Sequence, residues 1–198
     1  MKQLWKGTTM LNPVPAVMVT CVDSEGKPNI ITVAWAGTIN SKPPMLSISV
    51  KKERHSYSLI KEKGQFAVNL TNEALAYATD FCGVKSGRDV DKFEILKLNA
   101  DKASVIDVPL IKESPINLEC IVRQRIELGS HDMFIAEIVA VHVDDRLIGR
   151  NGKLDMNKAK LICYSHGEYW SLKEPLGYFG FSVTKRKRLK RNRMKRRD

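Results

Sequence analysis

The segment of residues 30–58 constrains the fold of this chain most, because it joins two apolar, β-branched runs through a polar loop. Residues 30–35 and 45–50 have the composition of strands. The loop between them, residues 37–44, is too long for a two-residue hairpin turn and ends in two prolines, which have fixed φ angles and no N–H groups. We therefore expect a stiff irregular loop whose unused backbone donors suit an anionic or hydrogen-bonding ligand. An ordinary surface loop is the alternative.

Strand-like runs recur along the rest of the chain, and helical patterns are short. Strands are expected at residues 14–22, 29–35, 45–50, 65–70, 116–128, 133–143 and 161–165. One helix should begin at His55 or Ser56 and end at Gly64, and a second should span residues 71–81 with Thr71 as its cap. Hairpin-joined strands predict a mainly β protein, an antiparallel β-barrel with a few flanking helices. A dinucleotide-binding α/β fold is disfavoured, because no G-x-G-x-x-G follows a strand.

The positive charge of the chain is concentrated at its end. Residues 185–198 hold ten Lys and Arg against one Asp, so they account for +9 of the formal +11 and leave +2 for residues 1–184. We expect residues 1–184 to form a single domain and residues 185–198 to be a disordered basic tail. Such a tail either contacts nucleic acid or acidic surfaces, or has no partner. No aromatic residue interleaves with its charges, so base stacking is not supported.

The sequence also limits the location of the protein. No apolar run approaches the roughly 20 residues that span a bilayer, and the first residues lack the apolar core of a secretory signal. We expect a cytoplasmic protein without a membrane partner. The cysteines are widely separated and form no C-x-x-C pair, so they predict buried hydrophobic residues and neither a metal site nor a dithiol.

Residues 82–93, CGVKSGRDVDKF, form a second informative stretch. Glycines, a serine and charged residues interrupt any periodicity there, which predicts an irregular loop that begins at Cys82. Its side chains Ser86, Arg88 and Lys92, with Gly87 between them, suit an anionic ligand. The alternative is a solvated loop whose charges pair with one another, each pair contributing less than about 1 kcal/mol.

Motifs for protein-based catalysis are missing from the sequence. It contains no nucleophile elbow, P-loop, H-E-x-x-H helix or paired-carboxylate pattern. Histidines are scattered, and His142, which alternates within an expected strand, is most simply structural. A reaction in which a cofactor does the chemistry needs only binding, orientation and electrostatic tuning from the protein. Polar loops around a β-barrel fit that role better than hydrolysis.

Four separated segments resemble the flavin reductase-like family, and within it the flavoredoxins. They are TVAWAGTINSKPPMLSISVKKERHSYS, CGVKSGRDVDKF, GSHDMFIAEI and LGYFGFSV. The resemblance implies an FMN-binding split β-barrel that forms a homodimer with FMN near the interface. It also implies an oxidoreductase that passes electrons from NADH, NADPH or a protein donor to a flavin or protein acceptor. A flavoredoxin-type electron carrier without its own NAD(P)H site is the alternative, and a nucleic-acid-binding protein that acts through the tail is a third.

The same resemblance implies the site residues. Flavin contacts are expected at Asn29, Trp35, Thr38, Ile39, Asn40 and Ser41, with Arg54, His55 and Ser56 at the phosphate. Lys92 would approach the flavin ring from the second loop, while His131 and Tyr164 would complete the pocket. Cys82 and Ser86 of that loop are further candidate cofactor contacts, and His166 and Tyr169, in a separate H-G-x-Y pattern, are candidates for the nicotinamide side. The alternatives are that Trp35 is plain core and that Lys92 is a solvated lysine.

Overall fold

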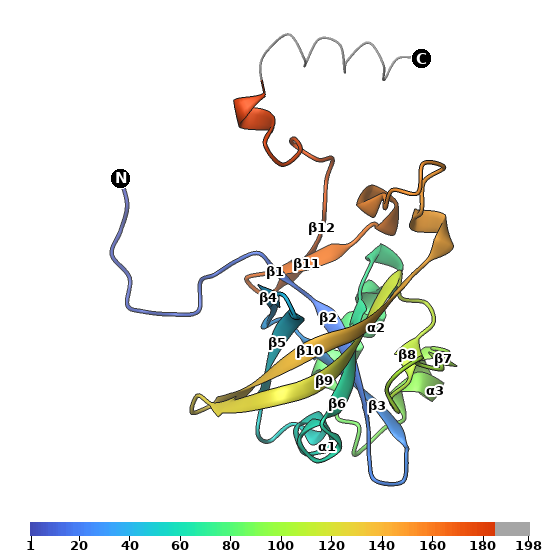
Figure 1. The fold of residues 1–198 in the computed structure, drawn as a ribbon. Coiled ribbons are helices and arrows are strands. Elements are labelled where there is room, and N and C mark those ends of the chain that lie inside the picture. Colours follow the sequence, from blue (N-terminus) through green and yellow to red (C-terminus); the bar gives the residue numbers. More distant parts are fainter. Residues whose placement is uncertain (185–198) are drawn as a thin grey trace.

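Antiparallel strands dominate the computed structural model, which describes residues 1–184 (Figure 1). Seven of them form one sheet in the order β3-β2-β6-β9-β10-β5-β4, and every neighbouring pair is antiparallel. They are β2 (Val17–Val22), β3 (Pro28–Val33), β4 (Ala36–Ser41), β5 (Pro44–Lys51), β6 (Gln65–Leu70), β9 (Ile116–Glu127) and β10 (His131–Val143). The predicted mainly β, antiparallel architecture is confirmed.

The sheet curls so that its two ends approach each other. Ile31 of β3 and Ile48 of β5 belong to the same core cluster, although these strands lie near opposite ends of the sheet order. Alternating side chains of the strands meet inside this curl and form the main core, in which Ile48, Phe66 and Phe134 are completely or almost completely buried. Burial of each such side chain contributes about 1.5–3 kcal/mol to folding.

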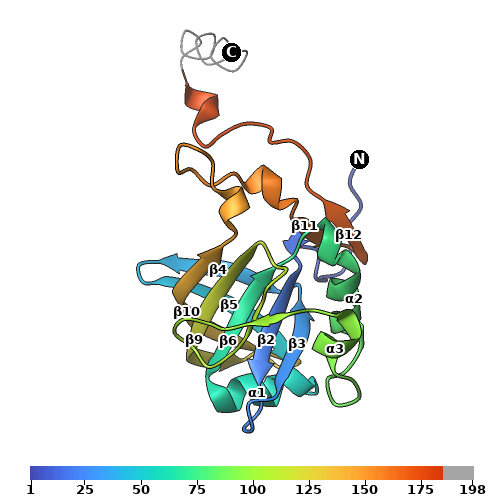
Figure 2. The ribbon, with the colours of Figure 1, turned by 90° about the vertical axis from the view of Figure 1, so that its right-hand side faces the viewer.

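Strand β2 is buried along its whole length because both of its faces are covered. Val17, Val19 and Cys21 belong to the main core, whereas Met18 belongs to a second apolar cluster with residues of α2 and α3. Figure 2 shows these two helices beside β3, at one end of the sheet. A strand packed on two faces has a continuous apolar sequence, which is why residues 17–22 carry no polar alternation.

Within residues 1–184 three α-helices accompany the sheet: α1 (His55–Lys63), α2 (Ala76–Val84) and α3 (Lys92–Leu96). The predicted start and end of α1 are confirmed. Gly64 ends the helix with a φ of 66° and donates its N–H to the carbonyl of Ile60, a conformation that glycine adopts without a steric penalty.

The predicted helix over residues 71–81 differs in its beginning. Asn72, not Thr71, caps the short 3₁₀ turn Glu73–Leu75 by accepting the N–H of Leu75, and α2 follows. Thr71 is buried and donates to the carbonyl of Ala16 at 2.5 Å. A tertiary hydrogen bond has therefore taken the side chain that the local pattern assigned to the cap. The prediction that an irregular loop begins at Cys82 is also wrong, because α2 extends to Val84.

The prediction of an irregular loop at residues 37–44 is wrong as well. Residues 36–41 form β4, which pairs with β5 through a tight turn at Lys42 and Pro43. The prolines do not prevent this hairpin, because Pro43 lies in the turn and Pro44 is the first residue of its strand, where a missing N–H costs no ladder bond.

The remaining elements are small. A three-stranded sheet contains β1 (Val14–Pro15), β11 (Ile162–Ser165) and β12 (Glu168–Ser171), and a separate pair joins β7 (Ala100–Asp101) to β8 (Leu110–Ile111). Further 3₁₀ turns are Asp145–Leu147, Met156–Ala159 and Phe181–Val183. No helix within residues 1–184 has the length and apolar composition to span a bilayer. The predicted disordered tail, residues 185–198, lies outside the described residues.

Candidate functional site

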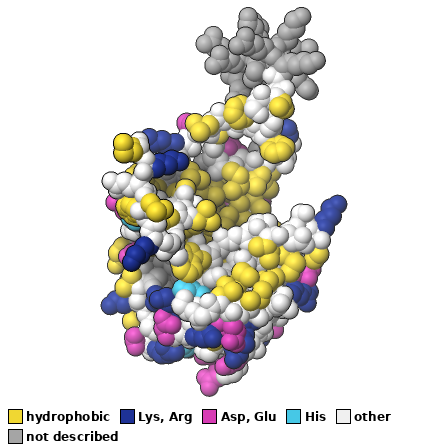
Figure 3. All heavy atoms as spheres, turned by 90° about the vertical axis from the view of Figure 1, so that its left-hand side faces the viewer, with side chains coloured by type: hydrophobic (Ala, Val, Ile, Leu, Met, Phe, Trp, Pro, Cys, Tyr) yellow, Lys and Arg dark blue, Asp and Glu magenta, His cyan; other side chains and the backbone are white. Residues whose placement is uncertain are grey.

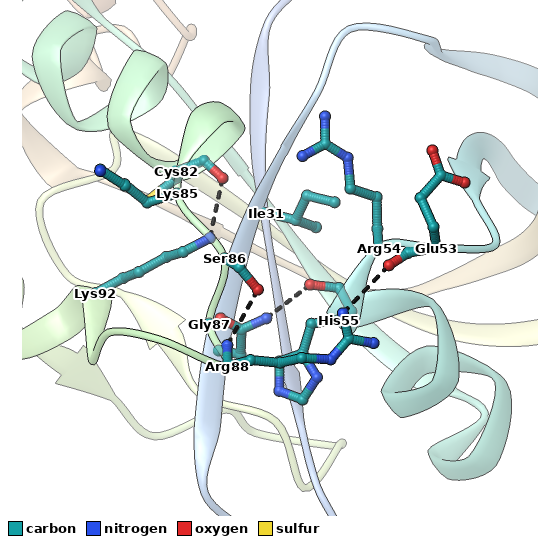
Figure 4. A pocket seen from close by; sticks show the side chains of 12 residues that line it. Ile31, Glu53, Arg54, His55, Cys82, Lys85, Ser86, Gly87, Arg88 and Lys92 are labelled. Carbon is teal, nitrogen blue, oxygen red and sulfur yellow. Dashed lines mark hydrogen bonds between the residues drawn. The ribbon is translucent and has the colours of Figure 1, made fainter.

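A polar pocket of about 280 Å³ lies between β3, the start of α1 and the turn that follows α2 (Figure 4). We call it the polar pocket. It is lined by Asn29, Ile31, Glu53, Arg54, His55, Ser56, Cys82, Lys85, Ser86, Gly87, Arg88 and Lys92. Four of these residues are Arg or Lys and one is a carboxylic acid, so the pocket favours a negatively charged ligand.

The N-terminus of α1 adds to this preference. Arg54 precedes the helix in an extended conformation, no side chain caps the first turn, and that turn contains no acidic residue. Its backbone N–H groups are therefore not used by a capping carboxylate or hydroxyl. The N-terminal end of a nine-residue helix carries partial positive charge and unpaired donors, and such ends bind phosphates and other anions.

Two buried side chains fix the floor of the polar pocket. The amide Nδ2 of Asn29, on β3, donates to Ser56 Oγ at 2.7 Å, and both residues are more than nine-tenths buried. Gly87 packs directly above them, since a Cβ at this position would lie 2.0 Å from Asn29 Oδ1. The turn after α2 can approach β3 this closely only because Gly87 has no side chain.

Arg88 crosses from this turn towards α1. Its Nη1 donates to the carbonyl of Glu53 at 3.3 Å, and its backbone N–H donates to Ser86 Oγ at 3.2 Å. Burial, together with the positive charges of Arg88 and Lys92, lowers the pKa of His55. The imidazole is therefore mainly neutral at pH 7, and the guanidinium and ammonium groups supply the charge of the pocket.

Lys92 is buried, so the alternative of a solvated lysine is wrong. Its side chain is 4 % exposed, and Nζ donates to the carbonyls of Ile30 at 2.6 Å and Cys82 at 3.0 Å. It therefore joins β3, α2 and the first turn of α3. Among residues 1–184 no carboxylate lies within ion-pair distance of this ammonium, and burial lowers its pKa.

A smaller cavity of about 170 Å³ adjoins the polar pocket, and Arg54 and Ile31 line both. Trp35 and His131 face each other in it, with ring centroids 4.4 Å apart. Trp35 is 45 % exposed, so the alternative that it is simply a core residue is wrong. Burial, with the nearby charge of Lys51, lowers the pKa of His131.

A wider groove of about 930 Å³ continues past Trp35, between the N-terminal segment and β5. Tyr164 and His166 line it, and Tyr164 also borders an adjoining cavity that contains Tyr169 and Asp80. The rings of the two tyrosines are 5.5 Å apart. Burial, the charge of Asp80 and a hydrogen bond to it raise the pKa of Tyr169 to about 12.

The structure thus sorts the predicted site residues into groups. Asn29, Arg54, His55, Ser56, Cys82, Ser86 and Lys92 share the polar pocket, Trp35 and His131 share the adjoining cavity, and Tyr164, His166 and Tyr169 lie along the groove. Thr38, Ile39, Asn40 and Ser41 line none of these cavities and are exposed on β4. Within one chain, therefore, Asn40 and Lys92 do not converge.

Lys85 is a pocket residue that the sequence did not reveal as such. It follows α2 directly and lies three residues after Cys82. The predicted helix ended at Phe81. Had it been extended by one turn, the three-residue spacing would have placed Cys82 and Lys85 on the same side of the helix.

Residues 10–173 match the family model described as "Flavin reductase like domain". The chain belongs to this family. An uncharacterized protein of Archaeoglobus fulgidus is 34% identical over 142 residues, which are 72% of this chain and 79% of that protein.

Two solved structures have the same fold as this chain. Flavoredoxin of Desulfovibrio vulgaris (Miyazaki F) has a TM-score of 0.87 and 31% identity, with 93% of this chain and 100% of that chain covered. Nitrilotriacetate monooxygenase component B from Bacillus cereus has a TM-score of 0.78 and 26% identity, with 85% and 88% covered. The resemblance inferred from the four sequence segments, including the flavoredoxins, is confirmed.

Proposed function

We propose that this protein binds FMN and is an oxidoreductase that passes electrons through it. The observation that carries the proposal is the polar pocket at the uncapped N-terminus of α1, which has the charge and size for a phosphate group. Family membership supports a flavin as the ligand. When bound, FMN would supply the hydride and electron chemistry, and the protein would supply binding and orientation.

The residues present fit the phosphate end of FMN. Ser56 offers a buried hydroxyl, the first turn of α1 offers backbone N–H groups, and Arg54 and Arg88 offer guanidinium groups on two sides. Hydrogen bonds in which donor or acceptor is charged are the stronger ones. These groups would bind and orient the phosphate. Lys92 lines this pocket and not the cavity beside Trp35, so we place its charge at the phosphate and not at the flavin ring, as the sequence had suggested.

The adjoining cavity beside Trp35 and His131 fits the ring end. Arg54 connects it to the polar pocket, so one ligand with an anionic tail and an aromatic head can contact both. An indole at the cavity wall offers a face on which a planar ring stacks. Trp35 would orient the flavin, and the neutral imidazole of His131 would support the indole from its other side.

The groove beyond Trp35 is the proposed approach for an electron donor. Its lining by Tyr164 and His166, with Tyr169 close by, agrees with a nicotinamide from NADH or NADPH. The second candidate is an electron carrier that exchanges electrons with a redox protein and has no NAD(P)H site. The likeness to flavoredoxin over the whole of that chain favours this candidate as much as the first.

A homodimer is part of the proposal. Large apolar side chains remain exposed on the N-terminal segment and after β12, among them Leu11 at 88% and Phe179 at 107%. Figure 3 shows hydrophobic side chains gathered around a hollow on one face. A second copy would cover them. The exposed residues Thr38 to Ser41 would then meet the FMN of the partner. Nucleic-acid binding through residues 185–198 and a cytoplasmic location stay predictions.

Titration with FMN tests the proposal. We expect flavin fluorescence to be quenched with one FMN per chain, and the complex to be yellow. Anaerobic mixing with NADH and with NADPH then separates the candidates. In an enzyme the nicotinamide reduces the bound flavin and the yellow colour is lost, whereas in a carrier without an NAD(P)H site the colour remains. A protein that neither quenches FMN fluorescence nor retains the colour would contradict the proposal.

A further inference from the structure

Asp132 is a buried carboxylate outside the cavities beside β3. It is the second residue of β10, and its side chain is inaccessible to solvent. Oδ2 accepts hydrogen bonds from Tyr57 Oη, at 2.6 Å, and from Arg125 Nη1. Oδ1 has no hydrogen-bond partner among the described residues, although Lys52 Nζ lies 3.4 Å away. This carboxylate is thus neutralised by two cations and directed at one hydroxyl.

Tyr57 brings this network to the start of α1. It belongs to the first turn of the helix, and its ring packs edge-on against Phe134 of β10 at 5.7 Å. Arg125 Nη1 also donates to Tyr57 Oη, at 3.0 Å, so the hydroxyl is held by a donor and an acceptor together. The Tyr57 side chain therefore has a fixed position relative to β9 and β10.

The first turn of α1 is consequently held from two directions. Ser56 faces the polar pocket and accepts the hydrogen bond from Asn29 on β3, whereas the next residue, Tyr57, is tied to Asp132 on β10. Strands β3 and β10 are not neighbours in the sheet. The turn that offers its N–H groups to the pocket thus spans two separate parts of the sheet, and its position depends on both attachments.

We propose that Asp132 is a positioning residue for anion binding, which holds the first turn of α1 in place through Tyr57. The proposal rests on the proposed function, because the anion is the phosphate of FMN. Asp132 itself lines none of the cavities beside β3. Its effect is therefore confined to the geometry of the backbone N–H groups and of Ser56.

The direction in which Asp132→Asn changes the affinity for FMN separates a positioning role from a long-range electrostatic one. Asp132→Asn removes a negative charge and keeps the shape of the side chain. If charge alone mattered, the variant would bind an anion equally or more tightly. A positioning role predicts weaker binding, since Arg125 loses its charged partner and Tyr57 its strong acceptor.

The experiment compares FMN with riboflavin, which lacks the phosphate, by fluorescence titration of the full chain. For Asp132→Asn we expect the FMN dissociation constant to rise about tenfold, the loss that a charged hydrogen bond represents, and that of riboflavin to change less than about twofold. Tyr57→Phe should also raise the dissociation constant of FMN, by a smaller factor. Asp107→Asn is the matched control, because Asp107 pairs on the surface with Lys63 at the other end of α1.

The outcomes are distinct. Unchanged or tighter FMN binding by both variants would overturn the proposal, as would an equal loss for FMN and riboflavin, which indicates general loosening. If Asp132→Asn does not fold, Tyr57→Phe alone decides, because it removes only a hydroxyl. If the unmodified protein binds no FMN, the proposed function fails first, and that result is recognisable before any variant is made.

Discussion

The indole of Trp35 and the imidazole of His131 lie with their ring centroids 4.4 Å apart, tilted by 40°. Trp35 lies in the connection between β3 and β4, the two edge strands of the sheet, and His131 begins β10. Their contact forms part of the wall of the smaller cavity. It also divides the wider groove from the cavity that leads to the polar pocket, so the ring end and the phosphate end of a flavin are testable separately.

Trp35→Ala should weaken FMN and riboflavin binding by the same factor. Loss of one aromatic contact, worth about 1 kcal/mol, corresponds to roughly a fivefold change in the dissociation constant. Fluorescence titration with both flavins measures it. Trp170→Ala is the control, because Trp170 is also exposed but lines none of the cavities. A loss confined to FMN would place Trp35 at the phosphate instead.

Gly87→Ala should damage the polar pocket with little effect on folding. The new Cβ would lie 2.0 Å from Asn29 Oδ1, so the Asn29 side chain must leave Ser56. We expect a loss of about 1 kcal/mol in the free energy of unfolding, the worth of one hydrogen bond, and weaker binding of FMN but not of riboflavin. Gly83→Ala is the matched control, since a Cβ there makes an ordinary contact with Thr32 at 3.4 Å. Normal FMN binding by Gly87→Ala would contradict the assignment.

Lys92→Met should change both anion binding and the pH dependence of stability. Without the buried ammonium, we expect FMN to bind about tenfold more weakly at pH 7, because a charge beneath the phosphate is lost. Burial lowers the pKa of Lys92 in the folded state, so the unfolded chain holds this proton more tightly. The contribution of Lys92 to stability therefore rises as the pH increases through its folded pKa towards about 10.4, the value for unfolded lysine.

Urea denaturation at pH 7.5 and 9.5 measures this contribution. The unfolding free energy of the unmodified protein should grow relative to that of Lys92→Met as the pH rises. Lys61→Met, at an exposed position, is the control: the difference in unfolding free energy between it and the unmodified protein should not change with pH. A difference that is constant or shrinks with pH would mean that burial does not depress this pKa.

Glu119→Gln should destabilise the fold without touching the site. The buried carboxylate accepts the N–H groups of Ser104, Val105 and Ile106 at 2.7–2.9 Å and contacts His142 Nε2 at 2.5 Å. We expect a loss of about 3 kcal/mol at pH 7, because charged hydrogen bonds are replaced by weaker ones. Burial opposes ionisation, but these hydrogen bonds outweigh it and lower the pKa of Glu119.

A depressed carboxyl pKa fixes the sign of the pH effect. The stability from Glu119 is complete above about pH 4.3, the unfolded value, and is lost as the pH falls through the folded pKa. The difference in unfolding free energy between the unmodified protein and Glu119→Gln, measured by thermal denaturation, should therefore become smaller below pH 4. The affinity for FMN at pH 7 should be unchanged. Glu113→Gln, at an exposed position that also accepts a backbone N–H, should lose less than about 1 kcal/mol. A difference in unfolding free energy that grows as the pH falls would refute this account of Glu119.

Local signals in the sequence predicted the parts of the fold that depend on neighbouring residues. The end of α1 at Gly64 and the strand at residues 65–70 follow from a C-terminal glycine and a short, mainly apolar run. Ser56 was placed at a helix start by the same kind of reasoning. The hairpin of β4 was missed because proline was taken as a sign of irregular structure, whereas its position within the turn decides the outcome.

Long-range contacts could not be predicted in this way. Lys92 appears in a run of charged residues, and only the folded chain shows that its ammonium is bound by carbonyls of β3 and α2. Glu119 and Asp132 likewise occupy strand positions at which a charged residue usually faces solvent. Each is buried because partners distant in the sequence satisfy it, and periodicity carries no information about such partners.

The structure of crystals grown with FMN is the most direct test of the central claim, that the start of α1 binds the phosphate. The account predicts electron density for the phosphate in the polar pocket, with its oxygens within hydrogen-bond distance of Ser56 Oγ and of first-turn N–H groups of α1, and with the flavin ring beside Trp35. Phosphate density outside this pocket, or a pocket that stays filled by water at saturating FMN, would contradict it.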